Sequence, residues 1–267
     1  MAWDDRYYSH ATHPSIPTEL GKLPSVTTIT GCYPKPWMFA WVMKESRLAA
    51  EKLLVKLSEG PISQEDMTGY LKGVVTAAET KRDTAADIGT QLHELIHVWA
   101  KSYHQQPTFN LMAELARKPE PVQKGFGAFL EWAQRENFRP VDTEHVVYSA
   151  RHGYAGRLDI TGFLGDDFAL LDGKSSSDIY PEQVLQLVAY AKAYEETRPR
   201  LFGADFKPLR RLILLRLGKF DGLCEPREID PSLVKGAFKQ FLALKRTWHF
   251  SKGWEKVYKA RVTVVTR

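Results

Sequence analysis

The chain has 267 residues, 43% of them hydrophobic and 26% charged, which is typical of a globular protein rather than a disordered or fibrous one. Its two cysteines are too few for a disulfide framework, a four-cysteine zinc site or an iron–sulfur cluster. The longest apolar run, Trp37–Met43, is far shorter than the roughly 20 residues of a membrane helix, and no apolar signal segment follows the polar start. We therefore expect a cytoplasmic protein with no membrane partner and no iron–sulfur cluster.

The positive charge is concentrated in the last third of the chain. The net charge is +5, but residues 198–219 hold seven basic residues against one acidic residue, and residues 245–267 hold the same. A basic stretch of this kind suits a polyanion, most commonly nucleic acid. Aromatic residues alternate with the basic ones in the second stretch, at Trp248, Phe250, Trp254 and Tyr258. They suit either base stacking or anchoring of the last helix to the core.

The predicted elements of the first half are mainly helical. Residues 1–24 look irregular, and residues 25–72 carry helical patterns that are broken near residues 33–36 and 60–61. A clearer helix follows, because Thr84 with Asp87 resembles a capping box. The apolar residues after it have helical spacing: Ile88, Leu92, Leu95, Ile96 and Trp99. Another helix is predicted over residues 125–136.

The hydrophobic period then changes from that of a helix to that of a strand. Strands are predicted over residues 144–150, 155–164 and 167–174, then a helix over 181–196, a strand over 209–217 and a helix over 231–250. This order predicts an α+β (α/β) fold with a small mixed sheet flanked by helices. We expect residues 1–75 to form an N-terminal extension and helical region, packed on a core of residues 76–267 with a basic C-terminal helix and tail.

The segment 156–174 predicts a β-hairpin that sets two carboxylates face to face. Gly165-Asp166 suits a two-residue turn of the primed type, which places Asp159 opposite Asp172 and puts Lys174 on the same face. Carboxylates this close resist joint ionisation unless a cation lies between them, and their oxygens suit Mg²⁺ or Mn²⁺. The ammonium of Lys174 can then orient a water or stabilise charge on a phosphate. Alternatively, the hairpin face is exposed and Asp159 pairs with a basic neighbour.

Two helices carry further polar residues that are able to complete a site. Gln186 and Tyr190 stand one helical turn apart on the predicted helix 181–196, where an amide and a phenol are able to hold a phosphate or a base. His93 lies at the edge of the apolar stripe of the earlier helix. Either set also fits an ordinary surface or a structural histidine.

Together, these pieces resemble the PD-(D/E)XK nuclease superfamily, most closely its RecB-like exonuclease branch, over about residues 84–218. The resemblance is carried by four motifs, Gly89-Thr-Gln-Leu-His93, Gly156-Arg-Leu-Asp159, Asp172-Gly-Lys174 and Gln186-Leu-Val-Ala-Tyr190. The restriction-endonuclease-like αβββαβ core of that superfamily agrees with the predicted order of elements.

The resemblance implies a role for each residue that matches a motif. His93, Asp159, Asp172 and the main-chain carbonyl of Gly173 would bind Mg²⁺ or Mn²⁺. Asp159, Asp172 and Lys174 would be catalytic, and Gln186 and Tyr190 would support the site and contact DNA. Glu144, on the first predicted strand and outside these motifs, is a candidate supporting acidic residue, although nothing in its local sequence requires that role.

The implied activity is phosphodiester hydrolysis by a DNA exonuclease, with a 5′-phosphate product, in DNA recombination, repair or phage genome processing. The setting would be a bacterial cell or a phage-infected host, with a possible recombination or helicase partner. Whether the DNA is single- or double-stranded stays open.

Two rival interpretations remain. His93-Glu-Leu-Ile-His97 matches H-E-x-x-H, in which two histidines one turn apart bind zinc and Glu94 acts as the general base of a metallopeptidase. That interpretation leaves the hairpin and the basic stretches unexplained. The other rival is a non-catalytic DNA-binding module built on the basic and aromatic C-terminal region.

Overall fold

The computed structural model describes residues 7–103, 111–203 and 206–265. The chain forms two compact units, one made of Met1–Tyr33 with Gln91–Arg267 and the other of Pro34–Thr90. Within the described ranges, no helix is both long and apolar enough to cross a bilayer. The first unit contains the sheet and all the predicted site residues.

A five-stranded mixed sheet forms the centre of the first unit. Its strands are β3 (Arg139–Ser149), β4 (Tyr154–Leu164), β5 (Asp167–Lys174), β6 (Arg211–Leu217) and β7 (Cys224–Glu228), and they lie in that order. β5 and β6 are parallel, and the other neighbouring pairs are antiparallel. Helix α6 (Pro181–Phe202) makes the crossover between the two parallel strands. The prediction of an α+β fold with a mixed sheet is therefore confirmed.

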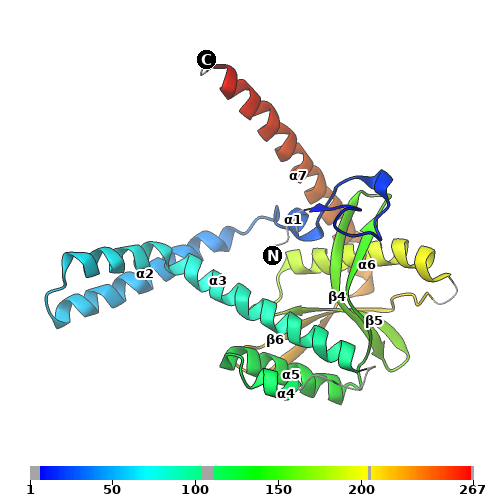
Figure 1. The fold of residues 1–267 in the computed structure, drawn as a ribbon, viewed down its shortest axis with the longest axis horizontal. Coiled ribbons are helices and arrows are strands. Elements are labelled where there is room, and N and C mark those ends of the chain that lie inside the picture. The colour runs from blue at the N-terminus through cyan, green and yellow to red at the C-terminus, as the bar shows by residue number, and fades with distance from the viewer. Residues whose placement is uncertain (1–6, 104–110, 204–205, 266–267) are drawn as a thin grey trace. The chain divides into compact units, whose positions relative to one another are not determined.

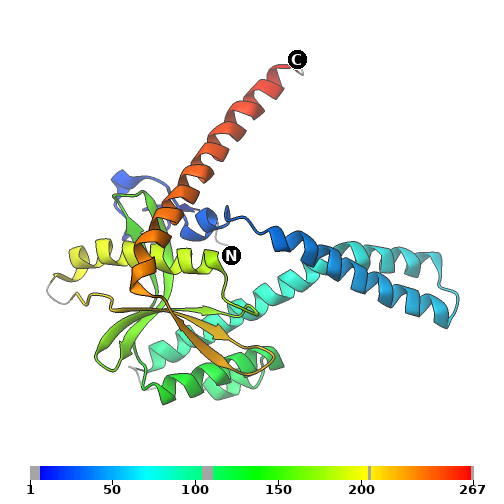
Figure 2. The same cartoon turned by 180° about the vertical axis from the view of Figure 1, so that it is seen from behind.

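Helices cover both faces of this sheet. α6, α1 (Val26–Thr30) and the start of α7 (Pro231–Val265) pack on one face, and α5 (Glu120–Arg135) lies on the other (Figures 1 and 2). The 91–102 part of α3 (Gln64–Ser102) packs beside α5, where Trp99 makes an edge contact with Phe129. The remaining short elements of this unit are β1 (Tyr7–Tyr8), η1 (Thr18–Leu20), β2 (Leu23–Pro24) and α4 (Leu111–Leu115).

The β4–β5 hairpin has the predicted register at its turn. Leu164 pairs with Asp167, and the ladder continues to Ile160 opposite Leu171. Gly165 has a φ of 62°, a left-handed conformation that glycine adopts without strain and that fits a primed turn. The turn residues therefore set which side chains of the two strands meet.

Several predicted element boundaries are wrong. Thr84 does not begin a helix, because α3 is continuous and the Thr84 hydroxyl donates to the carbonyl of Thr80 inside it. β3 starts five residues earlier than expected, at Arg139, and α7 continues past residue 250 to Val265. β7 was not predicted, because it is a short, mostly exposed edge strand that contains Pro226 and has no apolar alternation.

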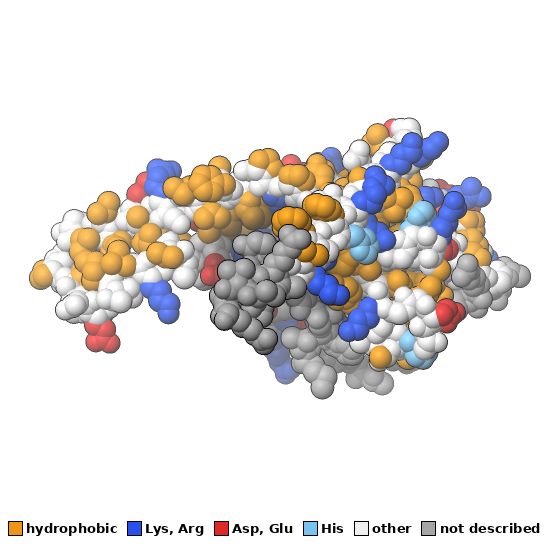
Figure 3. Space-filling view, turned by 90° about the horizontal axis from the view of Figure 1, so that it is seen from above, with side chains coloured by type: hydrophobic (Ala, Val, Ile, Leu, Met, Phe, Trp, Pro, Cys, Tyr) orange, Lys and Arg blue, Asp and Glu red, His pale blue; other side chains and the backbone are white. Residues whose placement is uncertain are grey.

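The second unit is a pair of helices. α2 (Pro36–Glu59) and the 64–90 part of α3 run side by side, and Lys81 forms an ion pair across them with Glu45 at 2.8 Å. Several large apolar side chains of this unit are exposed, including Phe39, Leu54, Val55 and Val75, and Figure 3 shows hydrophobic side chains along its surface. Two helices by themselves bury little apolar area.

Candidate functional site

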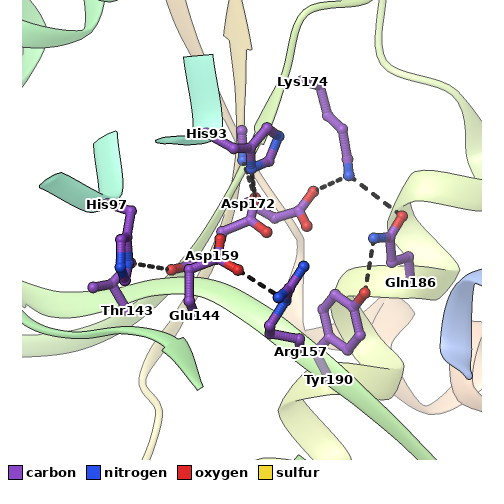
Figure 4. A network of polar contacts seen from close by, with 11 residues as sticks. His93, His97, Thr143, Glu144, Arg157, Asp159, Asp172, Lys174, Gln186 and Tyr190 are labelled. Atoms are coloured by element: carbon purple, nitrogen blue, oxygen red, sulfur yellow. Dashed lines mark hydrogen bonds and ion pairs between the residues drawn. The ribbon is translucent and has the colours of Figure 1, made fainter. Parts of the chain in front are cut away.

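Asp159 lies where the backbone ladder between β4 and β5 ends. The last backbone pair is Ile160 with Leu171, and beyond it the Asp159 Oδ2 accepts a hydrogen bond from the Gly173 N–H at 2.9 Å. The same oxygen is 3.2 Å from Nδ1 of His93, which reaches it from α3 (Figure 4). The carboxylate of Asp159 thus acts as an acceptor for the neighbouring strand while it faces the imidazole.

The strict alternation expected for β4 does not continue through Asp159. Leu158 packs in the apolar cluster that contains Leu170 and Tyr190, whereas Ile160 lines a cavity beside His93 on the side of α3. In a regular strand Leu158 and Ile160 would share one face of the sheet, but here they contact different sets of neighbours. The change of face at Asp159 turns its side chain toward His93.

Asp172 and Lys174 form a buried ion pair on β5. The Lys174 Nζ is 2.5 Å from the Asp172 Oδ2, and the Asp172 side chain is fully buried. Burial raises the pKa of Asp172 to about 6 despite the nearby ammonium. Burial alone would lower the pKa of Lys174, but the carboxylates of Asp172 and Asp159 outweigh it and raise that pKa. At neutral pH the lysine is therefore a cation and a proton donor rather than a base.

A chain of hydrogen bonds links Lys174 to α6. Its ammonium donates to the Gln186 Oε1 at 3.3 Å, and the Gln186 Nε2 donates to the Tyr190 hydroxyl at 3.0 Å (Figure 4). The Tyr190 ring is 4% exposed and packs on Gly156, where an added Cβ would lie 2.4 Å from a ring carbon. Glycine at position 156 therefore leaves the space that the Tyr190 ring occupies, and the ring in turn orients the Gln186 amide that contacts Lys174.

Glu144 joins the site through an unusual backbone conformation. Its φ is 54°, a left-handed value that residues other than glycine rarely adopt. Ligand atoms of Glu144, His93 and Asp159 all lie within 4.8 Å of one another, and Arg157 forms an ion pair with Glu144 at 2.8 Å. The sequence alone suggested only a supporting acidic residue here, because strand alternation carries no sign of a left-handed residue.

Thr143 is a site residue that sequence reasoning missed. Its hydroxyl donates to the Asp159 carbonyl at 2.8 Å and lies 3.3 Å from the Nδ1 of His97. A single threonine in a β-strand carries no signal of such a role, since threonine is common in strands.

The side chains at this edge of the sheet fit a divalent cation. Carboxylate oxygens and an imidazole nitrogen are ligands that Mn²⁺ accepts, and carboxylates suit Mg²⁺. Among the described residues, none donates a hydrogen bond of good geometry to either oxygen of Asp172, although both are buried. A cavity of about 10 Å³, about the space of one water or ion, is lined by residues that include His93, Glu144, Asp159 and Gly173. Asp172 is outside this lining and outside the group that His93, Glu144 and Asp159 form.

The residues of H-E-x-x-H do not converge. His97 contacts Thr143, and its pKa is lowered by burial and by the nearby Lys101 and Arg157, so it stays neutral. Glu94 is exposed. Within the described ranges, His93 groups with Glu144 and Asp159 as candidate metal ligands, and neither His97 nor Glu94 belongs to that group.

The aromatic residues of α7 divide into two groups. Trp248 is 6% exposed and its ring lies 5.8 Å from that of Tyr7, so it anchors the helix. Phe250 is 73% exposed and Trp254 is 63% exposed, on the part of α7 that extends away from the core of this unit (Figure 2). The side chain of Tyr258 lies outside the described residues.

Comparison with known proteins gives limited information. No family model and no curated protein matches the chain. A crystal structure of LHK-Exo in complex with dAMP is similar, with a TM-score of 0.34 and 13% sequence identity, over 63% of this chain and 93% of that chain. Similarity this low does not establish a shared fold or activity.

Proposed function

We propose that this protein is a metal-dependent deoxyribonuclease, an exonuclease of the RecB-like branch of the PD-(D/E)XK superfamily with a restriction-endonuclease-like core. The observation that carries the proposal is the fully buried Asp172, which pairs with Lys174 and has no other donor among the residues that the structure describes, next to the cluster of His93, Glu144 and Asp159. Lys174 lies near Oδ2 only, and a buried carboxylate oxygen that lacks a donor is costly unless a further cation approaches it. His93, Asp159, Asp172 and the Gly173 carbonyl would hold Mg²⁺ or Mn²⁺, and Glu144 is a further candidate ligand.

The residues around this cation site suit phosphodiester hydrolysis. When bound, the cation supplies Lewis-acid polarisation of the scissile phosphate and lowers the pKa of an attacking water. Lys174 is held as a cation by Asp172 and Gln186, so it can donate to the attacking water or to a phosphate oxygen on which charge develops. Asp159 accepts the Gly173 N–H, which fixes the Gly173 peptide between the two other catalytic residues.

The exposed surface of α7 supports DNA as the substrate. Phe250 and Trp254 present aromatic faces on which bases can stack, and basic residues lie between and around them. Because aromatic stacking tolerates any base, such a surface suits an enzyme that degrades DNA without reading its sequence.

A cleavage assay tests the proposal directly. End-labelled single- and double-stranded oligonucleotides are incubated with Mg²⁺, Mn²⁺ or EDTA. We expect metal-dependent cleavage by the wild type and a loss of about 1,000-fold or more in Asp172→Asn, because the buried carboxylate no longer holds the cation or balances Lys174. The ladder of products gives the polarity and the strand preference.

A matched control lies on the same strand. Asp167→Asn changes an exposed carboxylate at the other end of β5, and we expect it to cleave like the wild type. Equal loss in both variants points to a folding defect. Full activity of Asp172→Asn contradicts the proposed site.

A further inference from the structure

The backbone around Glu144 is held in place from two sides. Thr143 and His145, its neighbours, keep their register with Ile160 and Leu158 of β4, while Glu144 between them has the left-handed φ. Without restraint, a glutamate in a strand relaxes to the extended conformation, because its Cβ disfavours a positive φ. Something in the fold therefore holds the segment.

Arg198 of α6 contacts two residues that flank Glu144. Its guanidinium donates to the Asp142 carboxylate through Nη2 and to the His145 Nε2 through Nη1 at 2.8 Å. The His145 Nδ1 lies 2.8 Å from the same oxygen of Asp142. These three side chains close a ring, and the contacts fit the tautomer in which the His145 Nε2 accepts from Arg198 and the Nδ1 donates to Asp142.

The position of Arg198 makes this ring rigid. The arginine is 5% exposed, and its guanidinium carbon lies 5.4 Å from the centre of the Tyr194 ring on the same helix. On the other side of the segment, the Thr143 hydroxyl donates to the carbonyl of Asp159. Residues before and after Glu144 are thus tied to α6 and to β4.

We propose that Arg198 is a positioning residue for the cation site, because it holds Asp142 and His145 so that Glu144 keeps its left-handed backbone and directs its carboxylate toward His93 and Asp159. The inference rests on the proposed cation site. It makes α6 support the site twice, through Gln186 on one side of the sheet edge and through Arg198 at the far end of the helix.

Titration with Mn²⁺ by calorimetry, in the absence of DNA, tests the inference without relying on activity. We expect Glu144→Gln to weaken Mn²⁺ binding by about 10-fold, and Arg198→Met to weaken it by a similar factor, as the loss of outer-shell support typically does. The double variant is expected to lose about 10-fold rather than the ~100-fold of independent effects, because both changes remove the same contribution.

Two further variants separate positioning from folding. Thr197→Val removes the neighbouring contact between α6 and β3, in which the Thr197 hydroxyl bonds the backbone of Tyr148, so it should lower stability and leave Mn²⁺ binding within twofold of the wild type. Arg198→Lys keeps the charge but not the two-pronged contact, and we expect an intermediate loss.

The outcomes distinguish the two proposals. Wild-type affinity in both Arg198 variants, or independent effects in the double variant, overturns the positioning role and leaves the cation site standing. Failure of the wild type to bind Mn²⁺ overturns the cation site and the positioning role together.

Discussion

The two ends of the β4–β5 hairpin are held together in different ways. At the turn, backbone pairs run from Leu164–Asp167 to Ile160–Leu171, and buried apolar side chains pack on them. At the open end, the Asp159 carboxylate accepts the Gly173 N–H. The turn end is stabilised by burial and backbone pairing, whereas the open end places ionisable groups where they are costly unless a ligand balances them.

This contrast explains where the candidate chemistry lies. Charged groups in a dry environment interact more strongly than they do in water, so the open end is where a cation or phosphate gains most. The turn end of the hairpin fixes the register, and the register brings Asp159 near the Asp172–Lys174 pair.

After the loss of Asp172, the largest expected difference in Mn²⁺ affinity is between alanine variants of the two α3 histidines. His93→Ala removes a candidate ligand at the open end and should weaken Mn²⁺ binding by about 100-fold, the upper end of the 10- to 100-fold loss that outer-shell changes cause. His97→Ala removes the contact with Thr143, away from the candidate ligands, and should stay within threefold. Calorimetry on both variants measures this, and the reverse order, or stoichiometric zinc in the purified protein, favours the peptidase interpretation.

The raised pKa of Asp172 predicts that cation binding depends on pH. Because protonation of this carboxyl competes with the cation, and His93 also binds only when deprotonated, Mn²⁺ affinity should fall by at least about tenfold for each pH unit below about 6. Titrations at pH 7, 6 and 5 measure the slope. An affinity that does not change over this range would exclude Asp172 as a ligand.

The raised pKa of Asp172 also affects the stability of the cation-free fold, to which this group contributes more at acidic pH. Its folded pKa of about 6 exceeds the ordinary value of 3.8, so the folded state binds more protons between these values and stability decreases as pH rises through them. The urea midpoint of the wild type relative to that of Asp172→Asn, both in EDTA, should therefore be higher at pH 5 than at pH 7.

Substitutions of two glycines are expected to have the smallest effects on stability and cleavage, and they compare the two ends of the hairpin directly. Gly156→Ala places a Cβ 2.4 Å from the Tyr190 ring, so it should cost about 2 kcal/mol and lower cleavage about tenfold by displacing Gln186 from Lys174. Gly165→Ala strains only the turn, at φ 62°, and should cost about 1 kcal/mol with cleavage unchanged. Urea unfolding and the cleavage assay measure both effects, and equal activity in the two variants would contradict the role given to Tyr190.

Local patterns were sufficient to predict much of this fold. Strand alternation and Gly165-Asp166 predicted β4, β5 and their register near the turn, because these depend on neighbours within a few residues. Helical spacing placed Gln186 and Tyr190 on one face, where they form a hydrogen bond. The capping-box prediction at Thr84 was wrong, because a threonine inside a helix can bond its own preceding turn.

The sequence by itself thus determined the hairpin, the mixed α+β order of elements and the residue types available for a cation site, since each follows from period, turn chemistry or charge. Only the tertiary structure decided that Glu144 is left-handed, that Asp159 accepts a backbone N–H and that Arg198 ties α6 to both sides of Glu144. These features join residues 14 to 56 positions apart. Contacts at such separations leave no trace in a local pattern, because they arise only when the packed sheet and helices bring the side chains together.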